Sequence, residues 1–260
     1  MKSFYGDEKY RGYFEGWYLK QQNRTETVAL IPAFHVDARG KASASLQVIT
    51  ETQAYKIDFR RQSFHANGKI FLVYLDKCVF SERGCNLDVA EGNCTLRGAL
   101  RFGRFTHLAY DIMGPFRFVP FMECRHSVFS FHHRVDGELT INGRQFLFEN
   151  GSGYMEGDRG RSFPKRYLWT QCSWGGSNSI MLSAAEIPYA GLNFTGCIGF
   201  IFLDGKEYRI ATYCGAKLLY ISNDTILLTQ KALTLKIKLL RGRSQYLRAP
   251  QSGSMIRDDP

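Results

Sequence analysis

Alternating apolar and polar stretches joined by two-residue turn signals constrain the fold of this chain more than any other feature. Asn142-Gly143 lies between two such stretches, and Asp204-Gly205 lies between two more. Asn-Gly and Asp-Gly favour the tight turns with positive φ that connect antiparallel strands. Both segments are therefore predicted to be β-hairpins.

The same period of two appears elsewhere in the chain. Residues 45–50 and 55–59 alternate apolar and polar side chains, and Leu233, Leu235 and Ile237 share one face with polar residues between them. We find no sustained helical period. Strands that recur about every 8–12 residues predict an all-β fold, either a barrel or a sandwich of antiparallel strands.

A weak internal repeat suggests two halves. The separation between Trp17 and Trp169 is almost the same as that between the Tyr-Lys-Ile at 55–57 and the Tyr-Arg-Ile at 208–210. Two prolines interrupt the strand pattern in residues 113–123, which indicates a division there. The predicted units are an N-terminal half at 1–115, a linker at 116–127 and a C-terminal half at 128–260.

The composition is that of a globular protein with bulky side chains. Of 260 residues, 44% are apolar and 22% are charged, which is ordinary for a globular chain. Aromatic residues, at 14%, are frequent. They can line a large apolar cavity, although the simpler interpretation is a tightly filled β core.

The chain is basic, with a net charge of +10 and an isoelectric point near 9.3. A basic surface favours nucleic acids, anionic membranes or acidic ligands. Because there is no RNP-like aromatic repeat, zinc-finger spacing or basic heptad helix, we expect no nucleic-acid partner. A peripheral contact with an anionic membrane remains open.

Cysteine usage and the N-terminus bear on the compartment. Seven cysteines occur, an odd number, and no Cys-x-x-Cys is present. This favours free thiols in a reducing compartment. The first residues contain no apolar leader, and no apolar run approaches the ~20 residues of a membrane span. We therefore expect a cytoplasmic protein.

Residues 151–172 form the densest cluster of unusual residues. Four glycines, a proline and several charged residues precede an aromatic segment that begins at Tyr167. We expect a long structured loop at 151–165 that contacts both halves, since loops of this length usually carry function. Glu156 and Asp158 lie two residues apart, so they point the same way where the chain is extended.

The pattern Tyr-x-Glu-x-Asp-x-Gly-x-x-Phe-Pro-Lys-Arg-Tyr-x-Trp-x-Gln-Cys at residues 154–172 resembles the signature of tocopherol cyclase and its bacterial relatives. Glu-Gly-Trp-Tyr-Leu-Lys at residues 15–20 resembles the N-terminal motif of the same family. The resemblance implies a pseudo-duplicated fold of two lipocalin-like antiparallel β-barrels packed together. It also implies an isomerase that protonates a prenyl alkene and captures the cation with a phenolic oxygen.

This chemistry needs an acid strong enough to protonate carbon, and Glu156 and Asp158 are the catalytic candidates. Two neighbouring carboxylates raise the pKa of one of them, and an apolar pocket raises it further, which suits a neutral proton donor. The alternative is structural, because either carboxylate can pair with a nearby cation and fix the loop. Those cations are Arg159, Arg161, Lys165 and Arg166.

Aromatic faces stabilise a carbocation, and polar side chains can orient the phenolic oxygen. For each aromatic residue the simpler interpretation is core packing, and for each polar residue it is a satisfied position at a barrel rim. The candidate substrate-binding residues are Glu15, Trp17, Tyr18, Lys20, Tyr154, Tyr167, Trp169 and Gln171.

We expect neither a metal nor a cofactor. His132 and His133 are adjacent, so on a strand they face opposite ways and cannot chelate one ion, and the other histidines are scattered. The chain has no glycine-rich nucleotide loop and no Gly-x-Ser-x-Gly elbow.

Two rival functions stay open beside a metal-independent cyclase. An alkene hydratase, similar to the carotenoid hydratases, would use water in place of the phenol. A carrier would hold a hydrophobic or prenylated small molecule without chemistry. The position of Glu156 and Asp158 separates a carrier from an enzyme, since a carrier would place both carboxylates on the outer surface.

Overall fold

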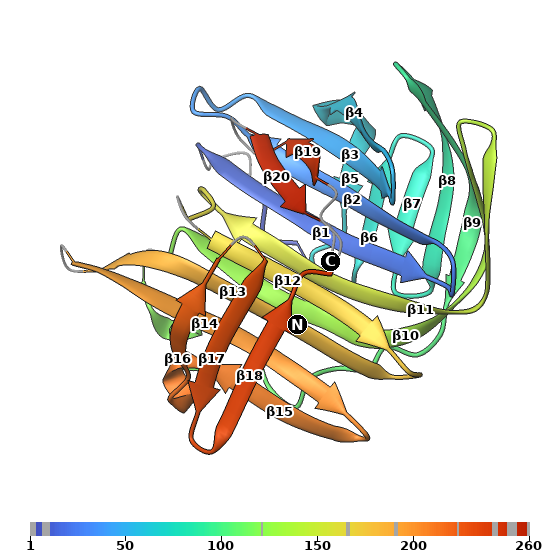
Figure 1. Cartoon of the computed structure of the whole chain (residues 1–260). Coiled ribbons are helices and arrows are strands. Elements are labelled where there is room, and N and C mark those ends of the chain that lie inside the picture. Colours follow the sequence, from blue (N-terminus) through green and yellow to red (C-terminus); the bar gives the residue numbers. More distant parts are fainter. Residues whose placement is uncertain are drawn as a thin grey trace.

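The computed structural model describes residues 4–6, 11–120, 122–164, 167–189, 192–222, 224–240, 244–248 and 254–258. Strands account for almost all regular structure in these ranges (Figure 1), which confirms the predicted all-β class. The helical elements among them are three short 3-10 turns, η1 (Arg61–Ser63), η2 (Gly114–Phe118) and η3 (Thr212–Cys214). No helix in the described part of the chain has the length and apolar character needed to cross a membrane.

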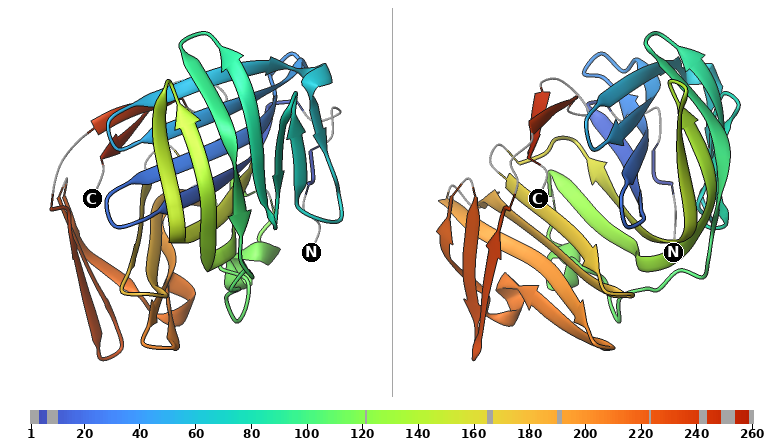
Figure 2. Two further views of the ribbon diagram at one scale, coloured as in Figure 1. Left: turned by 90° about the vertical axis from the view of Figure 1, so that its right-hand side faces the viewer. Right: turned by 45° about the vertical axis from the view of Figure 1, so that its right-hand side comes forward.

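The largest sheet has eleven antiparallel strands in the order β4-β3-β2-β1-β11-β10-β9-β8-β7-β6-β5. It curves around the main hydrophobic core (Figure 2). Its strands are β1 (Tyr13–Gln22), β2 (Thr27–Val36), β3 (Ala42–Thr50), β4 (Ala54–Arg60), β5 (Phe64–Ala66), β6 (Leu72–Leu75), β7 (Cys78–Ser81), β8 (Gly84–Glu91), β9 (Cys94–Phe102), β10 (Cys124–Ile141) and β11 (Arg144–Gly160).

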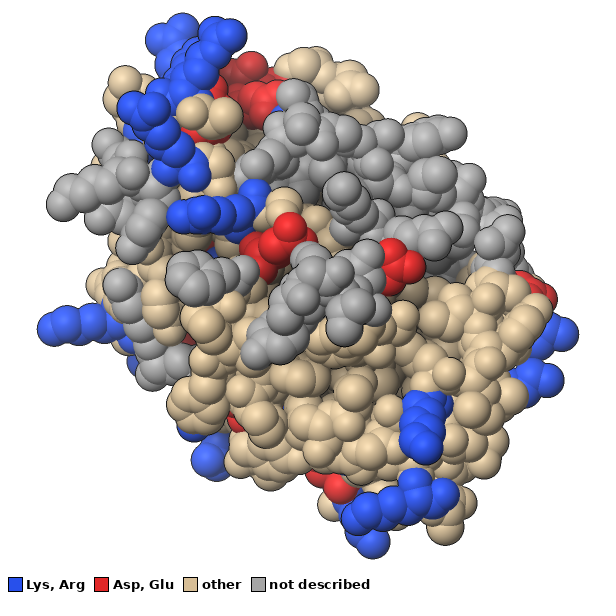
Figure 3. Space-filling view, turned by 90° about the vertical axis from the view of Figure 1, so that its left-hand side faces the viewer, with Lys and Arg blue, Asp and Glu red and all other residues tan. Residues whose placement is uncertain are grey.

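Three smaller antiparallel sheets follow. The four-stranded and three-stranded sheets enclose a second apolar cluster, which includes Leu182, Ile210 and Leu228. Figure 3 shows that much of the lower surface on this side of the molecule is uncharged, with Lys and Arg and a few acidic side chains scattered over it and along its edges. The strands, sheet by sheet, are β12 (Tyr167–Trp174), β13 (Asn178–Tyr189), β14 (Leu192–Leu203) and β15 (Lys206–Ala211); β16 (Lys217–Ile221), β17 (Thr225–Gln230) and β18 (Leu233–Lys238); β19 (Ser244–Arg248) and β20 (Ser254–Asp258).

Both predicted hairpins are confirmed. Asn142 (φ 47°) and Gly143 (φ 81°) form the two-residue turn between β10 and β11, and Asp204 (φ 49°) and Gly205 (φ 80°) form that between β14 and β15. Positive φ at both central residues matches the right-handed twist of the strands. The side chain of Asn142 also accepts a hydrogen bond from the backbone N–H of Thr95, at 2.6 Å, which ties the turn to β9.

The predicted loop at 151–165 is wrong over most of its length, because β11 continues to Gly160 between β1 and β10. Its glycines serve close packing rather than turns. A Cβ at Gly157 would lie 2.9 Å from the ring of Phe129 and 3.0 Å from the carbonyl oxygen of Gly16. A Cβ at Gly160 would lie 2.0 Å from the carbonyl oxygen of Glu123. A glycine-rich strand in the middle of a sheet therefore looks like a loop in the sequence.

Gly160→Ala is expected to lower the free energy of unfolding by about 2 kcal/mol, because the added methyl group meets backbone atoms that cannot move independently. Urea unfolding of both proteins measures the difference. Gly68→Ala is the matched control, since a Cβ there has its nearest contact at 3.9 Å. Equal effects of the two substitutions would contradict this interpretation.

The described strands form open sheets, because the order of the large sheet begins at β4 and ends at β5. The two closed lipocalin-like barrels therefore stay a prediction. The large sheet includes β10 and β11, so the chain changes sheet between Gly160 and Tyr167 and not in residues 116–127. The division into domains at 116–127 also stays a prediction.

Residues 110–112, before β10, contact the four-stranded sheet and the turn that follows it. The guanidinium of Arg209, on β15, donates to the carbonyl oxygens of Tyr110 and Asp111 at 2.9 and 3.2 Å and lies 3.9 Å from the ring centroid of Tyr110. The hydroxyl of Tyr213 donates to the carbonyl oxygen of Ile112 at 2.9 Å. Ile112 in turn packs in a third apolar cluster, which contains residues of both the large sheet and the four-stranded sheet.

Candidate active site

The candidate site lies where β12 crosses the outer face of the large sheet. Alternation places Tyr18 and Lys20 of β1 on this face, in register with Glu156 and Tyr154 of β11. The ring of Tyr18 meets that of Trp169, on β12, edge to face with centroids 5.3 Å apart. The ammonium of Lys20 donates to Gln171 Oε1, also on β12, at 2.9 Å. Six of the predicted residues therefore come together between the two sheets: Tyr18, Lys20, Tyr154, Glu156, Trp169 and Gln171.

The carboxyl group of Glu156 is the centre of this arrangement, with only 4% of the residue exposed. Tyr154 Oη donates to Glu156 Oε2 at 2.5 Å, and Trp169 Nε1 donates to the same oxygen at 3.2 Å. His126 Nε2 lies 3.3 Å from Oε2, without the alignment of a hydrogen bond. Among the described residues, these three contacts of the carboxyl therefore all end on one oxygen, Oε2.

His126, on β10, connects Glu156 to Asp158. Its Nδ1 lies 2.9 Å from Asp158 Oδ1, and the thiol of Cys124 also donates to that oxygen at 3.5 Å. Burial by itself lowers the pKa of His126, but Asp158 and Glu156 outweigh it and hold the pKa well above the usual value. The raised pKa favours the protonated form of His126, and its imidazole ring lies between the two carboxyl groups.

Two tyrosines next to the carboxylates remain neutral. Burial, followed by the charge of Glu156 and a hydrogen bond to it, raises the pKa of Tyr154 well above the usual range. Burial, followed by the charge of Asp158, raises the pKa of Tyr167. Both phenols therefore act as O–H donors or apolar rings and not as bases.

Two predicted residues lie elsewhere. Trp17 points to the opposite face of β1 from Tyr18 and packs in the main core against Phe71, with ring centroids 5.7 Å apart. Glu15 shares the parity of Trp17 and accepts hydrogen bonds from the backbone N–H groups of residues 5 and 6 and from the hydroxyl of Tyr13. The structure therefore does not bring Glu15 or Trp17 to the site.

The remaining predicted residue, Tyr167, lies at the edge of the site. Its ring stacks on Phe163 at a centroid distance of 5.3 Å, and Phe163 stacks on Phe14 at 4.9 Å. The charge of Asp158 acts on its hydroxyl. This aromatic stack covers the end of the site where β11 leaves the large sheet.

The trio of His126, Glu156 and Asp158 offers ligand atoms that lie within 4.8 Å of one another, a spacing at which they could hold a metal ion. The ring nitrogens argue against one. Nδ1 already faces Asp158, so an ion on Nε2 would have only His126 and Glu156 as direct ligands. Structural and catalytic zinc sites use at least three protein ligands.

We therefore expect the purified protein to carry no stoichiometric transition metal. Elemental analysis of protein prepared without a histidine tag, before and after dialysis against a chelator, measures this. The thermal midpoint is expected to be the same in both preparations, because no protein-bound ion would be removed. One equivalent of zinc, iron or manganese that disappears in the Glu156→Gln variant would contradict the expectation.

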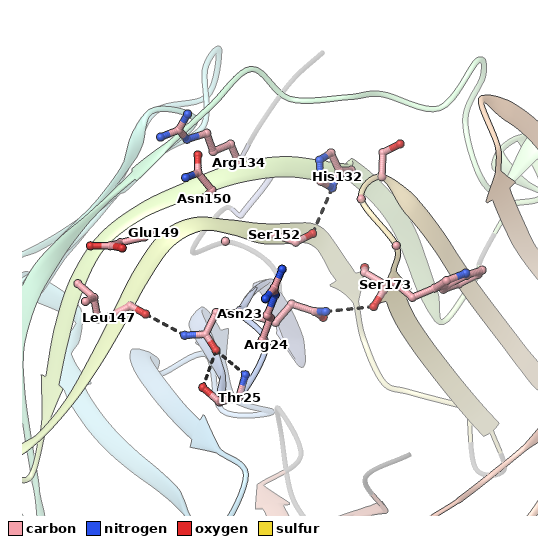
Figure 4. A pocket seen from close by; sticks show the side chains of 16 residues that line it. Asn23, Arg24, Thr25, His132, Arg134, Leu147, Glu149, Asn150, Ser152 and Ser173 are labelled. Carbon is pink, nitrogen blue, oxygen red and sulfur yellow. Dashed lines mark hydrogen bonds between the residues drawn. The ribbon is translucent and has the colours of Figure 1, made fainter.

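A pocket of about 890 Å³ continues from the site along the same strands (Figure 4). In its wall, His132 Nδ1 and Ser152 Oγ are hydrogen-bonded at 3.1 Å, and Gln22 Nε2 donates to the carbonyl oxygen of Ser173 at 3.0 Å. Because Gln22, Ser152 and Ser173 have the same parity as Tyr18, Glu156 and Trp169, the pocket lies on the same face of the large sheet. Polar side chains, among them Asn23, Arg24, Glu149 and Asn150, contribute to its lining.

Comparisons with known proteins agree with the motif. The chain is 28% identical over 137 residues to a protein of Oryza sativa subsp. japonica named as a chloroplastic tocopherol cyclase; the match spans 50% of this chain but only 29% of that protein. A solved structure from Nitrosomonas europaea, described as an AttH protein, aligns with a TM-score of 0.51 at 12% identity, over 90% of this chain and 82% of its own, and so shares the fold. Residues 81–187 match the family described as tocopherol cyclase-like, which confirms the resemblance of this chain to that family.

Proposed function

We propose that this protein catalyses the cyclisation of a prenyl chain onto a phenolic oxygen, with Glu156 as the proton donor. The observation that carries the proposal is the buried carboxyl of Glu156, held by Tyr154 and Trp169 between the two sheets. The match to the tocopherol cyclase-like family supports the reaction class.

The reaction would start from the neutral carboxylic acid form of Glu156. Tyr154 and Trp169 both donate to Oε2, so Oε1 is the oxygen that would carry the proton.

The reaction then follows without an external reagent. The O–H of Glu156 transfers its proton to the less substituted carbon of a trisubstituted alkene, whose π electrons form the new C–H bond. The phenolic oxygen attacks the resulting tertiary cation, and its proton returns to the Glu156 carboxylate. Atoms and charge balance, and the product is an isomer of the substrate.

The surroundings of Glu156 suit a cationic intermediate. The rings of Tyr18 and Trp169 meet edge to face beside the carboxyl, and an aromatic face attracts positive charge. The burial of Glu156 excludes water, which would otherwise capture the cation. Lys20 and Gln171 are the polar pair nearest to the aromatic rings along β1 and β12, and they are suited to hold the phenolic oxygen.

A carrier function is less favoured, because a carrier would place both carboxylates on the outer surface. Glu156 is buried, and Asp158 is partly buried beside His126. Hydration is distinguished from cyclisation by the nucleophile and therefore by the product.

The test is to incubate the protein with a prenylated hydroquinone in D₂O and to analyse the products by mass spectrometry. Cyclisation gives an isomer that carries one deuterium on carbon. Hydration gives a product heavier by one additional water, which would replace the proposal by its rival. Saturable binding of the same compound without turnover would indicate a carrier and contradict both reactions.

A further inference from the structure

Two buried polar side chains on the core side of the large sheet have unmatched hydrogen-bonding atoms. Gln21, on β1, is 0% exposed, and neither Oε1 nor Nε2 of its amide has a partner among the described residues. His133, on β10, is 1% exposed, and its Nε2 likewise has no partner within the described ranges. An unmatched polar atom in a protein core is costly, so each such atom requires an explanation.

The sheet register places these two side chains beside each other. Gly153, on β11, is the register partner of both Gln21 and His133, so all three positions face the same way. A Cβ on Gly153 would lie 2.2 Å from His133 Nε2. Because Gly153 has no side chain, the imidazole of His133 can lie over β11. Its Nε2 therefore extends from β10 toward β1, the strand that holds Gln21.

The hydrogen bonds of Ser130 determine which ring nitrogen of His133 carries the proton. Ser130 Oγ donates to the carbonyl oxygen of His132 at 2.9 Å and accepts from the N–H of Thr106 at 3.2 Å. Its remaining lone pair can only accept, so His133 Nδ1, at 3.1 Å, carries the hydrogen. Burial, followed by the neighbouring His132, lowers the pKa of His133 to about 3, so the ring is neutral. His133 Nε2 is therefore an acceptor that needs a donor.

We propose that Gln21, Gly153 and His133 form a binding site for one internal water molecule, which donates to His133 Nε2 and hydrogen-bonds to the Gln21 amide. Strands two apart in a sheet are separated by about 9.6 Å, a span that these side chains and one bridging molecule can fill. The rings of Phe102 and Phe105 pack on His133, with centroids at 4.8 and 4.6 Å, and isolate the site from solvent. The water would join β1 to β10 on the face of the sheet opposite the pocket residues Gln22 and Ser152.

A crystal structure of the full chain at a resolution that shows ordered water tests the proposal. The expected result is a solvent peak within hydrogen-bonding distance of both His133 Nε2 and the Gln21 amide. A direct hydrogen bond between the two side chains, or apolar contacts without solvent at this position, would overturn it.

Thermal unfolding gives an independent measurement. Gln21→Leu and His133→Phe are each expected to lower the midpoint by about 3–8 °C, and the double variant by less than their sum, because it leaves no unmatched atom. Gln22→Leu is the matched control, since its amide lies on the opposite face and donates to Ser173. The change in thermal midpoint caused by Gln22→Leu should simply add to the change caused by His133→Phe. If the changes caused by Gln21→Leu and His133→Phe also add exactly, that result would count against the water.

A separate observation concerns an exposed face formed by the β16–β18 sheet, by the turn that holds Lys231 and by Leu240, which follows β18. Leu219, Tyr220 and Leu240 are 57%, 55% and 83% exposed. Single exposed apolar residues are ordinary on a protein surface, but a group of them often marks an interaction site. The inward face of the same sheet packs on the second apolar cluster. Lysines accompany the exposed apolar residues, and the only acidic residue between 217 and 238 is Asp224. The lysines are Lys217, Lys231, Lys236 and Lys238.

We infer that this face, defined by Leu219, Tyr220, Leu240 and the four lysines, docks on an anionic phospholipid bilayer. The argument is charge complementarity: cations beside exposed apolar and aromatic side chains suit the interface of a membrane that carries negative headgroups. The sheet is on the side of the four-stranded sheet that faces away from the large sheet, so docking leaves the carboxyl site uncovered.

Flotation with vesicles of phosphatidylcholine, with and without phosphatidylglycerol, tests the inference on the full chain. Binding is expected only with phosphatidylglycerol and is expected to weaken as salt is added. Lys236→Glu and Lys238→Glu should each weaken it about fivefold or more, and Tyr220→Ser should weaken it without changing the salt dependence.

Lys69→Glu and Ile70→Ser are the matched controls, since Ile70 is 56% exposed beside a lysine on the other part of the molecule. They are expected to leave binding unchanged. Absence of wild-type binding to the anionic vesicles at low salt, or an equal loss in the controls, would overturn the inference.

Discussion

Replacing Glu156 by Gln is expected to lower the turnover of a prenylated hydroquinone by about a hundredfold or more while the fold is retained. Glutamine has nearly the size of glutamate, and its amide oxygen can still accept from Tyr154 and Trp169. It has no acidic proton to give to carbon. Initial rates, with the thermal midpoint measured on the same preparations, separate loss of chemistry from loss of folding.

The controls for this experiment come from the same sheet and the same site. Glu138→Gln changes an exposed carboxylate of β10 that lies outside the pocket, and it should have no effect. Asp158→Asn should reduce turnover less than Glu156→Gln, because Asp158 acts on Glu156 through His126. Full activity of Glu156→Gln with an intact fold would show that the proton comes from another group. Unfolding of both variants would instead support a structural role for the two carboxylates.

The hairpins and the all-β class could be predicted because they depend on local chemistry. The turn residues need only positive φ, which Asn, Asp and Gly supply. The glycines of β11 misled the prediction for the opposite reason. Their role depends on how closely Gly16, Phe129 and Glu123 approach in the folded sheet, and no local pattern reports that approach.

The site was only partly predictable from the sequence. The alternation of β1 could have separated Trp17 from Tyr18, since adjacent residues of a strand face opposite sides. His126 was missed for another reason. Regular pairing from the Asn142-Gly143 turn would place it opposite Arg159, and irregularities in the β10–β11 pairing shift it to Asp158. The sequence contains no signal for these irregularities.

His126→Asn is expected to lower the free energy of unfolding by about 3 kcal/mol near neutral pH, because it removes the cation between two carboxyl groups in a buried site. For a chain of this size that corresponds to a fall of about 10 °C in the thermal midpoint. His65→Asn, at an exposed position, is the matched control and should be nearly neutral. The thermal midpoints of the three proteins provide the comparison.

The pH dependence separates this ionic role from simple loss of packing. The pKa of His126 is raised on folding, chiefly by Asp158 and Glu156 against the effect of burial. Its contribution is therefore fully present below the ordinary histidine pKa of about 6.5 and is lost as the pH rises through the raised value. The difference in unfolding free energy between wild type and His126→Asn should accordingly narrow as the solution becomes alkaline. A difference that stays constant with pH would mean that His126 stabilises the site by its shape and not by its charge.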